Sequence, residues 1–196
     1  MTIYKGQNII GVPGLTEEDF ADCALEYLSS GGSSCLYNKN GHFVYYNPNG
    51  KNGGDCGKNF FSTNTMEQGV AYYLYAGTQC EVTFDQPGQV EVTLYPNVQN
   101  IISVPVETSL ADVALVGGDE AKIFTNFRSG TKAGCEYNKN GYFVYYDTGS
   151  ASGTDGDCGS KFKSESKMRP FVGYFVFSNG KDGDKTTQFK LSYPAT

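Results

Sequence analysis

The side chain most used in acid–base catalysis occurs only once in this chain, as His42. A hydrolytic triad needs a histidine beside its nucleophile, and zinc sites combine histidine with closely spaced cysteines. The chain has no C-x-x-C spacing, and His42 directly follows an Asn40-Gly41 turn signal. We therefore expect His42 to be a surface residue, with no catalytic residue and no metal site around it.

A pair of carboxylates could still support glycoside hydrolysis without a histidine. The acidic residues that recur within the chain are Asp55 with Asp157 and Asp19 with Asp112. The first two adjoin cysteines, and the other two stand where helices are expected to begin. These positions indicate structural roles, so we expect a protein that is not an enzyme and needs no cofactor.

Two glycine-rich segments, 47–57 and 147–159, carry side-chain oxygens that could bind Ca²⁺. One candidate group is Asp147, Asp155 and Asp157, and another is Asn179, Asp182 and Asp184. Neither has EF-hand spacing, and neither glycine-rich segment continues into the Lys-Ser/Thr of a P-loop. We expect surface loops here, with weak calcium binding as the alternative.

Tyrosines cluster at 45–46, 72–75 and 145–146. Aromatic faces held on strands could stack on sugar rings, because each ring combines an apolar face with a polar edge. The same alternating positions must also fill small cores, so we expect most of these rings to be buried. Glycan binding stays open as an alternative.

The two halves of the chain repeat one sequence pattern. The matches are QNIIGVP (7–13) with QNIISVP (99–105), YNKNGHFVYY (37–46) with YNKNGYFVYY (137–146), and GVAYYLY (69–75) with FVGYFVF (171–177). The offset grows from 92 to 100 to 102 residues, which places the insertions in loops, where they cost least stability. We expect two tandem domains, residues 1–96 and 97–196.

Each half is expected to begin with a strand, at 8–12 in the first, followed by a short helix. Thr16 fits the N-cap and Asp19 the acidic residue three positions later. The residues at helical spacing on one apolar face are Phe20, Cys23, Ala24, Tyr27 and Leu28. Ser109 and Asp112 hold the two capping positions in the second half.

A tight hairpin is expected next in each half, because Asn-Gly at 40–41 and 140–141 favours a type I′ turn. Further strands are expected at 70–75, 81–84, 90–95, 172–177 and 187–193. The sequence therefore predicts an α+β fold dominated by β structure, in which each half is a small antiparallel sheet or sandwich with one short helix.

This order of motifs resembles a repeat of bacterial, archaeal and viral surface proteins. Its usual form is a G-W-N-L-I-S-L-P strand, a short helix, a Y-D-x-x-G-W-x-Y-Y hairpin and an E-P-G-x-G-Y-W-V strand. Both halves match it over most of the chain, although Gln, Phe, Tyr or His stands at each tryptophan position. The resemblance implies a small β-rich module of extracellular or virion-surface proteins, and it implies no catalytic residue.

The repeat narrows the choice of disulfide partners for the six cysteines. Cys35 and Cys56 correspond to Cys135 and Cys158, whereas Cys23 and Cys80 have no counterparts. We predict the bridges Cys35–Cys56, Cys135–Cys158 and Cys23–Cys80, each able to add about 2–4 kcal/mol. Persistent bridges indicate an oxidising environment, and the alternative is six buried thiols.

Charge and hydropathy exclude some classes of function. The net charge of −6 arises in residues 1–97, which carry 4 basic and 10 acidic side chains. Neither half offers the basic surface that nucleic-acid binding requires. No run approaches the roughly 20 apolar residues of a membrane span, and the first residues lack the apolar core of a secretory signal.

These features favour a structural or interaction protein over an enzyme. We expect a disulfide-stabilised virion-surface component, such as a phage capsid decoration, fibre or spike subunit. Its partners would be other virion or surface proteins, including copies of itself. The alternative is a secreted or cell-surface binding module that recognises a glycan or a protein partner, for example in adhesion.

The three predicted bridges can be tested by intact-mass spectrometry. Reduction should raise the mass by six hydrogens, one for each cysteine, because every disulfide takes up two. An unchanged mass would show six free thiols, which would remove the argument for an oxidising environment.

Overall fold

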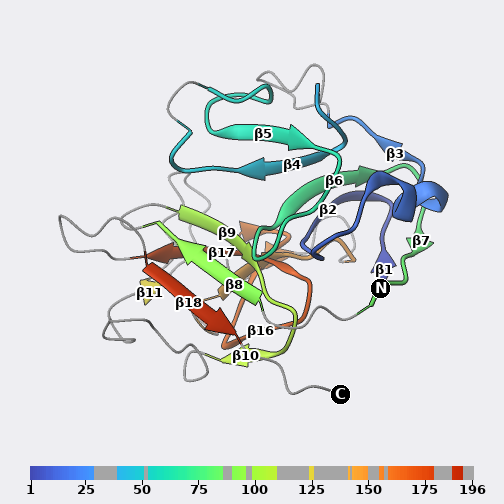
Figure 1. Cartoon of the computed structure of the whole chain (residues 1–196). Helices are drawn as coiled ribbons and strands as arrows, with labels where there is room; N and C mark the ends of the chain where they lie inside the picture. The colour runs from blue at the N-terminus through green and yellow to red at the C-terminus, as the bar shows by residue number, and fades with distance from the viewer. Residues whose placement is uncertain are drawn as a thin grey trace.

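Antiparallel strands form most of this computed structural model, and one short 3₁₀ helix, η1 (Glu17–Cys23), is present in the described part (Figure 1). The structure describes residues 1–28, 39–50, 53–85, 90–95, 99–109, 124–125, 141, 143–149, 155–156, 159–178 and 187–191. The prediction of a β-dominated α+β fold is therefore confirmed.

The strands divide between the two halves of the chain. Those of the first half are β1 (Thr2–Ile3), β2 (Gly6–Ile10), β3 (Leu25–Glu26), β4 (Phe43–Tyr46), β5 (Phe60–Thr63), β6 (Tyr72–Ala76), β7 (Cys80–Glu81) and β8 (Val90–Leu94). Those of the second are β9 (Gln99–Ser103), β10 (Thr108–Ser109), β11 (Phe124–Thr125), β12 (Phe143–Tyr146), β13 (Asp155–Gly156), β14 (Gly159–Ser160), β15 (Phe162–Glu165), β16 (Lys167–Met168), β17 (Gly173–Ser178) and β18 (Thr187–Leu191).

Two five-stranded sheets share one strand order. The first runs β2-β6-β4-β5, with β3 also paired to β6, and the second runs β9-β17-β12-β15, with β11 also paired to β17. The repeated motifs fall on β2, β4 and β6 in the first sheet and on the corresponding strands β9, β12 and β17 in the second. The sequence repeat is thus also a structural repeat, whereas the division into two separate domains stays a prediction.

The expected hairpin at Asn40-Gly41 is wrong. Strand β4 pairs with β5 along one edge and with β6 along the other, so no edge remains for the segment that precedes Asn40. A type I′ turn would need a positive φ at both residues, and only Gly41 has one, at 146°. The actual partner of β4 along its outer edge comes after a long loop, which local turn chemistry could not reveal.

Gly41 is needed for a different reason. A Cβ atom there would lie 2.3 Å from the carbonyl oxygen of Thr63, and one at Gly141 would lie 2.2 Å from that of Glu165. The glycine thus lets the chain entering β4 or β12 pass close to the end of the neighbouring strand. The repeated glycine serves close backbone approach rather than a hairpin turn.

The helix begins where predicted but ends early. The Thr16 backbone N–H donates to Asp19 Oδ2 at 2.7 Å, and Phe20 is buried. The helix stops at Cys23 because Ala24 takes a left-handed φ of 48°, and the chain then pairs with β6 as β3. Tyr27, expected on the apolar face, is 57% exposed.

In the second half Ser109 ends β10, while residues 110–123, including Asp112, lie outside the described residues.

The two halves meet through reciprocal backbone contacts. Isolated bridges join Ile10 to Val172 and Val70 to Ile102, and these four positions exchange under the repeat. The Gly11 N–H likewise donates to the Phe171 oxygen at 3.1 Å, and the Ser103 N–H to the Gly69 oxygen at 3.5 Å. The contacts follow a local two-fold relation, as in an isologous dimer interface.

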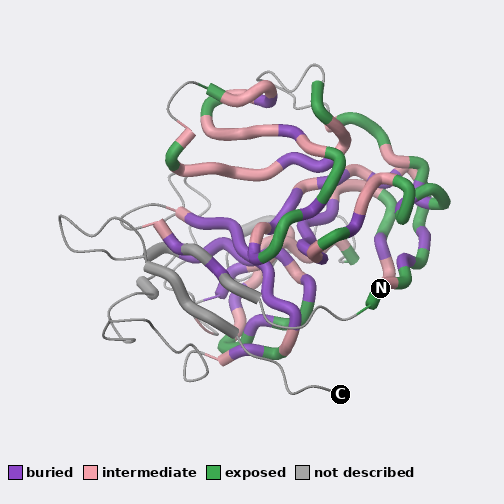
Figure 2. Tube along the Cα trace, viewed as in Figure 1, coloured by how far each residue is buried: buried purple, intermediate pink, exposed green. Residues whose placement is uncertain are grey.

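Buried apolar side chains from both halves fill this junction. Figure 2 shows buried segments concentrated where the two sheets meet. One cluster contains Ile9, Ala71, Ile101, Val144 and Phe175. The rings of Tyr73 and Phe175, which occupy equivalent positions in the repeat, lie 6.4 Å apart. The halves therefore share part of their core.

At the point where the backbones of the two halves come closest, there is room for the side chain of only one half. A Cβ atom on Gly11 would lie 2.2 Å from the Val70 oxygen and 2.6 Å from Ser103 Cβ. Ser103 is the repeat equivalent of Gly11, and its hydroxyl donates to the Gly11 oxygen at 2.8 Å. The difference between QNIIGVP and QNIISVP is thus a packing requirement.

Gly11→Ala should lower the free energy of unfolding by about 1–3 kcal/mol, the usual cost of overpacking. Adding Ser103→Gly should recover part of this loss, because it removes one of the two clashes. Urea unfolding of the variants measures both effects. Ser103→Ala alone is the control, since it keeps the Cβ atom and loses only a hydrogen bond worth about 1 kcal/mol. A neutral Gly11→Ala would contradict the reciprocal packing.

Candidate binding cleft

His42 lies against the helix instead of standing free on the surface. Its Nδ1 is 2.9 Å from Glu17 Oε1, and its backbone N–H donates to the same oxygen at 2.6 Å. Its ring stacks on Tyr27 with centroids 4.2 Å apart, and 21% of its side chain is exposed. These contacts tie the start of β4 to η1, which is a structural role.

Asp55 also has a structural role. Its carboxylate accepts the backbone N–H of Ser62 at 2.8 Å and the Ser62 hydroxyl, while the Asn40 N–H donates to that hydroxyl at 2.9 Å. The carboxylate thereby fastens the loop after β4 to β5. Its repeat equivalent, Asp157, lies outside the described residues.

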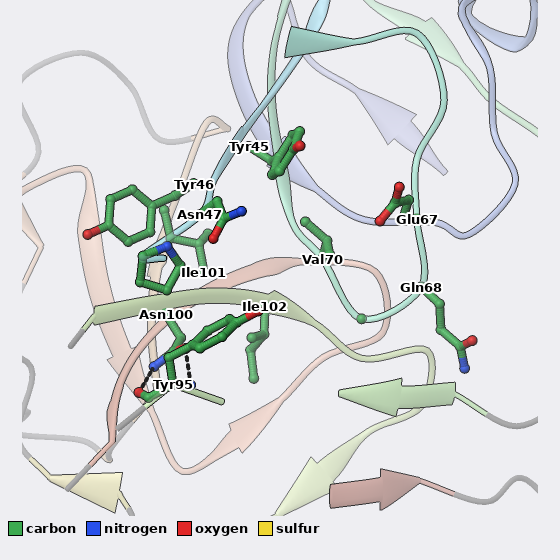
Figure 3. Close-up of a pocket in the computed structure, with 12 residues that line it drawn as sticks. Tyr45, Tyr46, Asn47, Glu67, Gln68, Val70, Tyr95, Asn100, Ile101 and Ile102 are labelled. Atoms are coloured by element: carbon green, nitrogen blue, oxygen red, sulfur yellow. Dashed lines mark hydrogen bonds between the residues drawn. The ribbon is translucent and has the colours of Figure 1, made fainter. Parts of the chain in front are cut away.

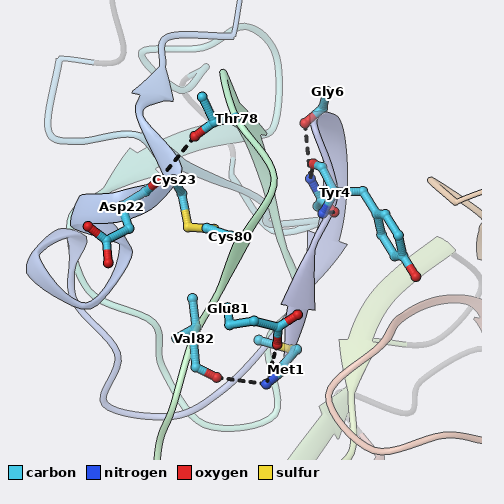
Figure 4. Close-up of a disulfide and its surroundings, with 10 residues drawn as sticks. Met1, Tyr4, Gly6, Asp22, Cys23, Thr78, Cys80, Glu81 and Val82 are labelled. Atoms are coloured by element: carbon cyan, nitrogen blue, oxygen red, sulfur yellow. Dashed lines mark hydrogen bonds and ion pairs between the residues drawn. A yellow bond between two sulfur atoms is a disulfide. The ribbon is translucent and has the colours of Figure 1, made fainter.

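The Cys23–Cys80 bridge is present, as predicted. Its Cα atoms are 5.1 Å apart, and it joins the end of η1 to β7 (Figure 4). Beside the bridge, the Thr78 hydroxyl donates a hydrogen bond to the backbone carbonyl oxygen of Asp22 at 3.0 Å. Cys56 is disulfide-bonded as well, but Cys35, Cys135 and Cys158 lie outside the described residues, so the other two pairings stay predictions.

The calcium candidates are only partly described. Asp147 forms an ion pair with Lys163 at 2.5 Å, which already neutralises its charge. Asp155 lies in β13, and Asp157, Asn179, Asp182 and Asp184 fall outside the described residues. Within the described ranges, no three His, Cys, Asp or Glu residues gather in a way that could hold a metal ion.

Tyrosines line a cleft between the two halves instead of forming a flat platform. This first cleft has a volume of about 310 Å³. Its walls include Tyr45, Tyr46, Glu67 and Tyr95 from the first half and Asn100, Ile101 and Ile102 from the second (Figure 3). Figure 3 shows the Glu67 carboxylate on the side of the cleft where the Tyr45 ring lies, while Gln68 points away.

Buried polar groups hold the walls of this cleft. Asn100 is only 3% exposed, and its side chain accepts the Tyr95 N–H at 2.8 Å and donates to the Tyr95 oxygen at 3.1 Å. Asn8 makes the same two bonds with Tyr4 at 3.2 and 2.7 Å. The repeated asparagine of QNII therefore positions one tyrosine at each cleft.

A second cleft of about 160 Å³ is the repeat counterpart of the first. It is lined by Tyr145, Tyr146, Asp147, Arg169 and Phe171, together with Tyr4. Phe171 replaces Gly69 and occupies space that is open in the first cleft. The Thr148 hydroxyl also donates a hydrogen bond to the backbone carbonyl oxygen of Gln7 at 2.8 Å, which closes the rim of the second cleft. The equivalent residue in the first cleft is Pro48, which has no hydroxyl to form this bond.

The two clefts differ in charge at one equivalent position. Arg169 places its guanidinium carbon 4.3 Å from the centre of the Tyr145 ring, and its Nε donates to Glu165 Oε1 at 3.1 Å. In the first cleft, Glu67 replaces Arg169 and Thr63 replaces Glu165. The sequence analysis missed this reversal, although aligning EQGV (67–70) with RPFV (169–172) would have revealed it.

A buried tyrosine supports the floor of each cleft. Tyr72 and Tyr174 are nearly unexposed, and their hydroxyls accept the backbone N–H groups of Glu67 at 2.8 Å and Arg169 at 2.9 Å. Burial raises the pKa of both phenols well above the ordinary value of 10.0. These two rings are structural. The expectation that most of the clustered tyrosines are buried is wrong, because Tyr72 is the only buried ring of those clusters and the others are half-buried: Tyr45, Tyr46, Tyr73, Tyr75, Tyr145 and Tyr146.

Comparison with known proteins gives no relative for this arrangement: no family model, curated protein or solved structure matches the chain. Among the described residues, no helix combines the length and apolar character that crossing a bilayer requires. The function must therefore be argued from the site itself.

The raised tyrosine pKa values predict instability in alkali. The folded state favours neutral phenols, so their contribution is complete below pH 10 and is lost as the pH rises above it. Each deprotonating tyrosine should lower stability by about 1.4 kcal/mol per pH unit. Urea unfolding between pH 8 and pH 11 measures the slope.

Two tyrosine variants make this test specific. Tyr72→Phe should flatten the alkaline slope, because phenylalanine has no proton to lose. Tyr174→Phe should flatten the slope in the same way, because burial also raises the pKa of that phenol. Slopes as steep as that of the unchanged protein in both variants would contradict the assignment.

Proposed function

We propose that this chain is a non-enzymatic structural or interaction protein of a virion or extracellular surface. A phage capsid decoration, fibre or spike subunit fits this description, with surface proteins and further copies of the chain as partners. On this proposal the chain is a tandem of two repeat domains, 1–96 and 97–196, packed against each other. The observation that carries the proposal is a reciprocally packed pair of repeats, of which the first contains the Cys23–Cys80 bridge.

The disulfide supports a surface location. The Cys23–Cys80 bridge joins two cysteines that are 57 positions apart in the sequence. It fastens the helix to the short β1–β7 sheet. Bridges of this kind persist in oxidising surroundings. A phage protein made in a reducing cytosol could acquire them after lysis.

The described polar clusters support a role without catalysis. His42 and Glu17 join two elements, Asp55 fastens a loop, and Asp19 caps the helix. The hydroxyls of Ser62 and Thr16 donate to Asp55 and Asp19, and both bonds hold local backbone segments in place. Each is used to hold the fold together.

Isolation of the protein from its native source tests the proposal. We expect it to co-sediment with particles that contain capsid or tail proteins, and to carry its disulfides when analysed without reductant. Recovery as a free intracellular protein with six reduced thiols would overturn the proposal.

Glycan binding is a second candidate, favoured by the three tyrosines that line the first cleft. Tyr45, Tyr46 and Tyr95 offer aromatic surface beside the polar Asn47 and Gln68. A glycan array probed with the intact protein and with Tyr46→Ala tests this candidate. Specific binding that the variant loses, by a protein found free in the medium, would favour the secreted binding module over the virion component.

A further inference from the structure

The second cleft shows how this scaffold holds a guanidinium group. Arg169 lies over Tyr145 at 4.3 Å and is paired with Glu165 at 3.1 Å. A cation over an aromatic face gains about 0.5–2 kcal/mol, depending on how far it is desolvated. The arginine therefore supplies, from within the chain, the cation that an aromatic and acidic site attracts.

The first cleft keeps the aromatic part of this arrangement and carries a carboxylate in place of the cation. Tyr45 stands at the position of Tyr145, and Glu67 provides a carboxylate at the position of Arg169. Within the described part of the chain, no Lys or Arg pairs with Glu67 or lies over Tyr45. The first cleft is also larger, at about 310 Å³ against 160 Å³.

The electrostatic environment of the first cleft is negative. Burial, followed by the charges of Glu67 and Asp55, raises the pKa of Tyr45. Burial also raises the pKa of Tyr145 in the second cleft, but there the positive charges of Arg169 and Lys163 oppose the shift. The first half of the chain also carries all of the net charge of −6, which would steer a cationic partner toward it.

We propose that the first cleft binds an arginine side chain of a partner protein, with Glu67 as the ion-pair acceptor and Tyr45 as the aromatic face. This inference rests on the proposed interaction function and names the chemistry of the contact. A planar guanidinium can pair with a carboxylate through two hydrogen bonds and stack on a ring, whereas an ammonium forms only a compact point charge. Arg169 already shows the stacked geometry within the same fold.

Nuclear magnetic resonance titration of the intact, oxidised chain tests the proposal. The probe is Nα-acetyl-arginine methylamide, and the matched ligand control is the corresponding citrulline compound, which has the same shape without the charge. We expect saturable shifts at the cleft residues Tyr45 and Val70 with the arginine probe. The citrulline compound should bind at least about tenfold more weakly, and added salt should weaken the arginine probe.

Variants separate the cleft from general charge attraction. Glu67→Gln should weaken binding of the arginine probe about tenfold, whereas Glu18→Gln, which removes the same charge from the exposed face of η1, should leave it unchanged. Glu67→Arg should abolish binding, because it places a guanidinium of the chain's own where Arg169 stands in the second cleft.

Three results would overturn the inference: no saturable shift at the cleft, equal binding of the arginine and citrulline probes, or equal losses in Glu67→Gln and Glu18→Gln. Saccharide binding that displaces the arginine probe would also overturn it in favour of the glycan candidate. The titration uses the isolated protein, so its failure leaves the surface role intact. Absence of the protein from particles, in turn, would not alter the result of the titration.

Discussion

The close approach of Gly11, directly after β2, to Ser103 at the end of β9 is the constraint on which the rest of the structure depends. The backbones come so near that a second Cβ atom has no room, and both halves donate backbone hydrogen bonds across the junction. Both clefts lie beside this junction, and each is lined by residues from the two halves. A change in the junction would therefore reshape both clefts together.

Repetition supplies the scaffold, and divergence at a few positions separates the two clefts. Gly69 and Phe171 share a left-handed conformation, with φ of 73° and 63°. That conformation strains a phenylalanine by about 1–3 kcal/mol. Burial offsets the strain, because Phe171 packs into the core of the first half with its ring 4.6 Å from Phe84. Phe171 in place of glycine thus narrows the second cleft and packs the two halves together.

Local signals predicted some elements well and failed where distant segments decide the outcome. The Thr16–Asp19 cap and the Cys23–Cys80 pairing were predictable, because capping chemistry is local and because both cysteines are missing from the second half. The Asn40-Gly41 hairpin was wrong, because β6 occupies the edge of β4 that a hairpin partner would have used. The helix ended early because Leu25 and Glu26 pair with β6 as strand β3 instead of continuing the helix. The cleft itself was missed, because its residues lie in segments far apart in the sequence.

The sequence by itself determined the β-rich class, the internal repeat, the start of the helix and one disulfide. Each of these follows from short-range spacing or from a comparison of the chain with itself. Only the tertiary structure decided that the repeats pack reciprocally, that Gly11 must lack a side chain and that Glu67 faces a tyrosine-lined cleft. These features depend on which backbones approach each other, and that choice is made by the shared core of Ile9, Ile101 and Phe175 rather than by any single segment.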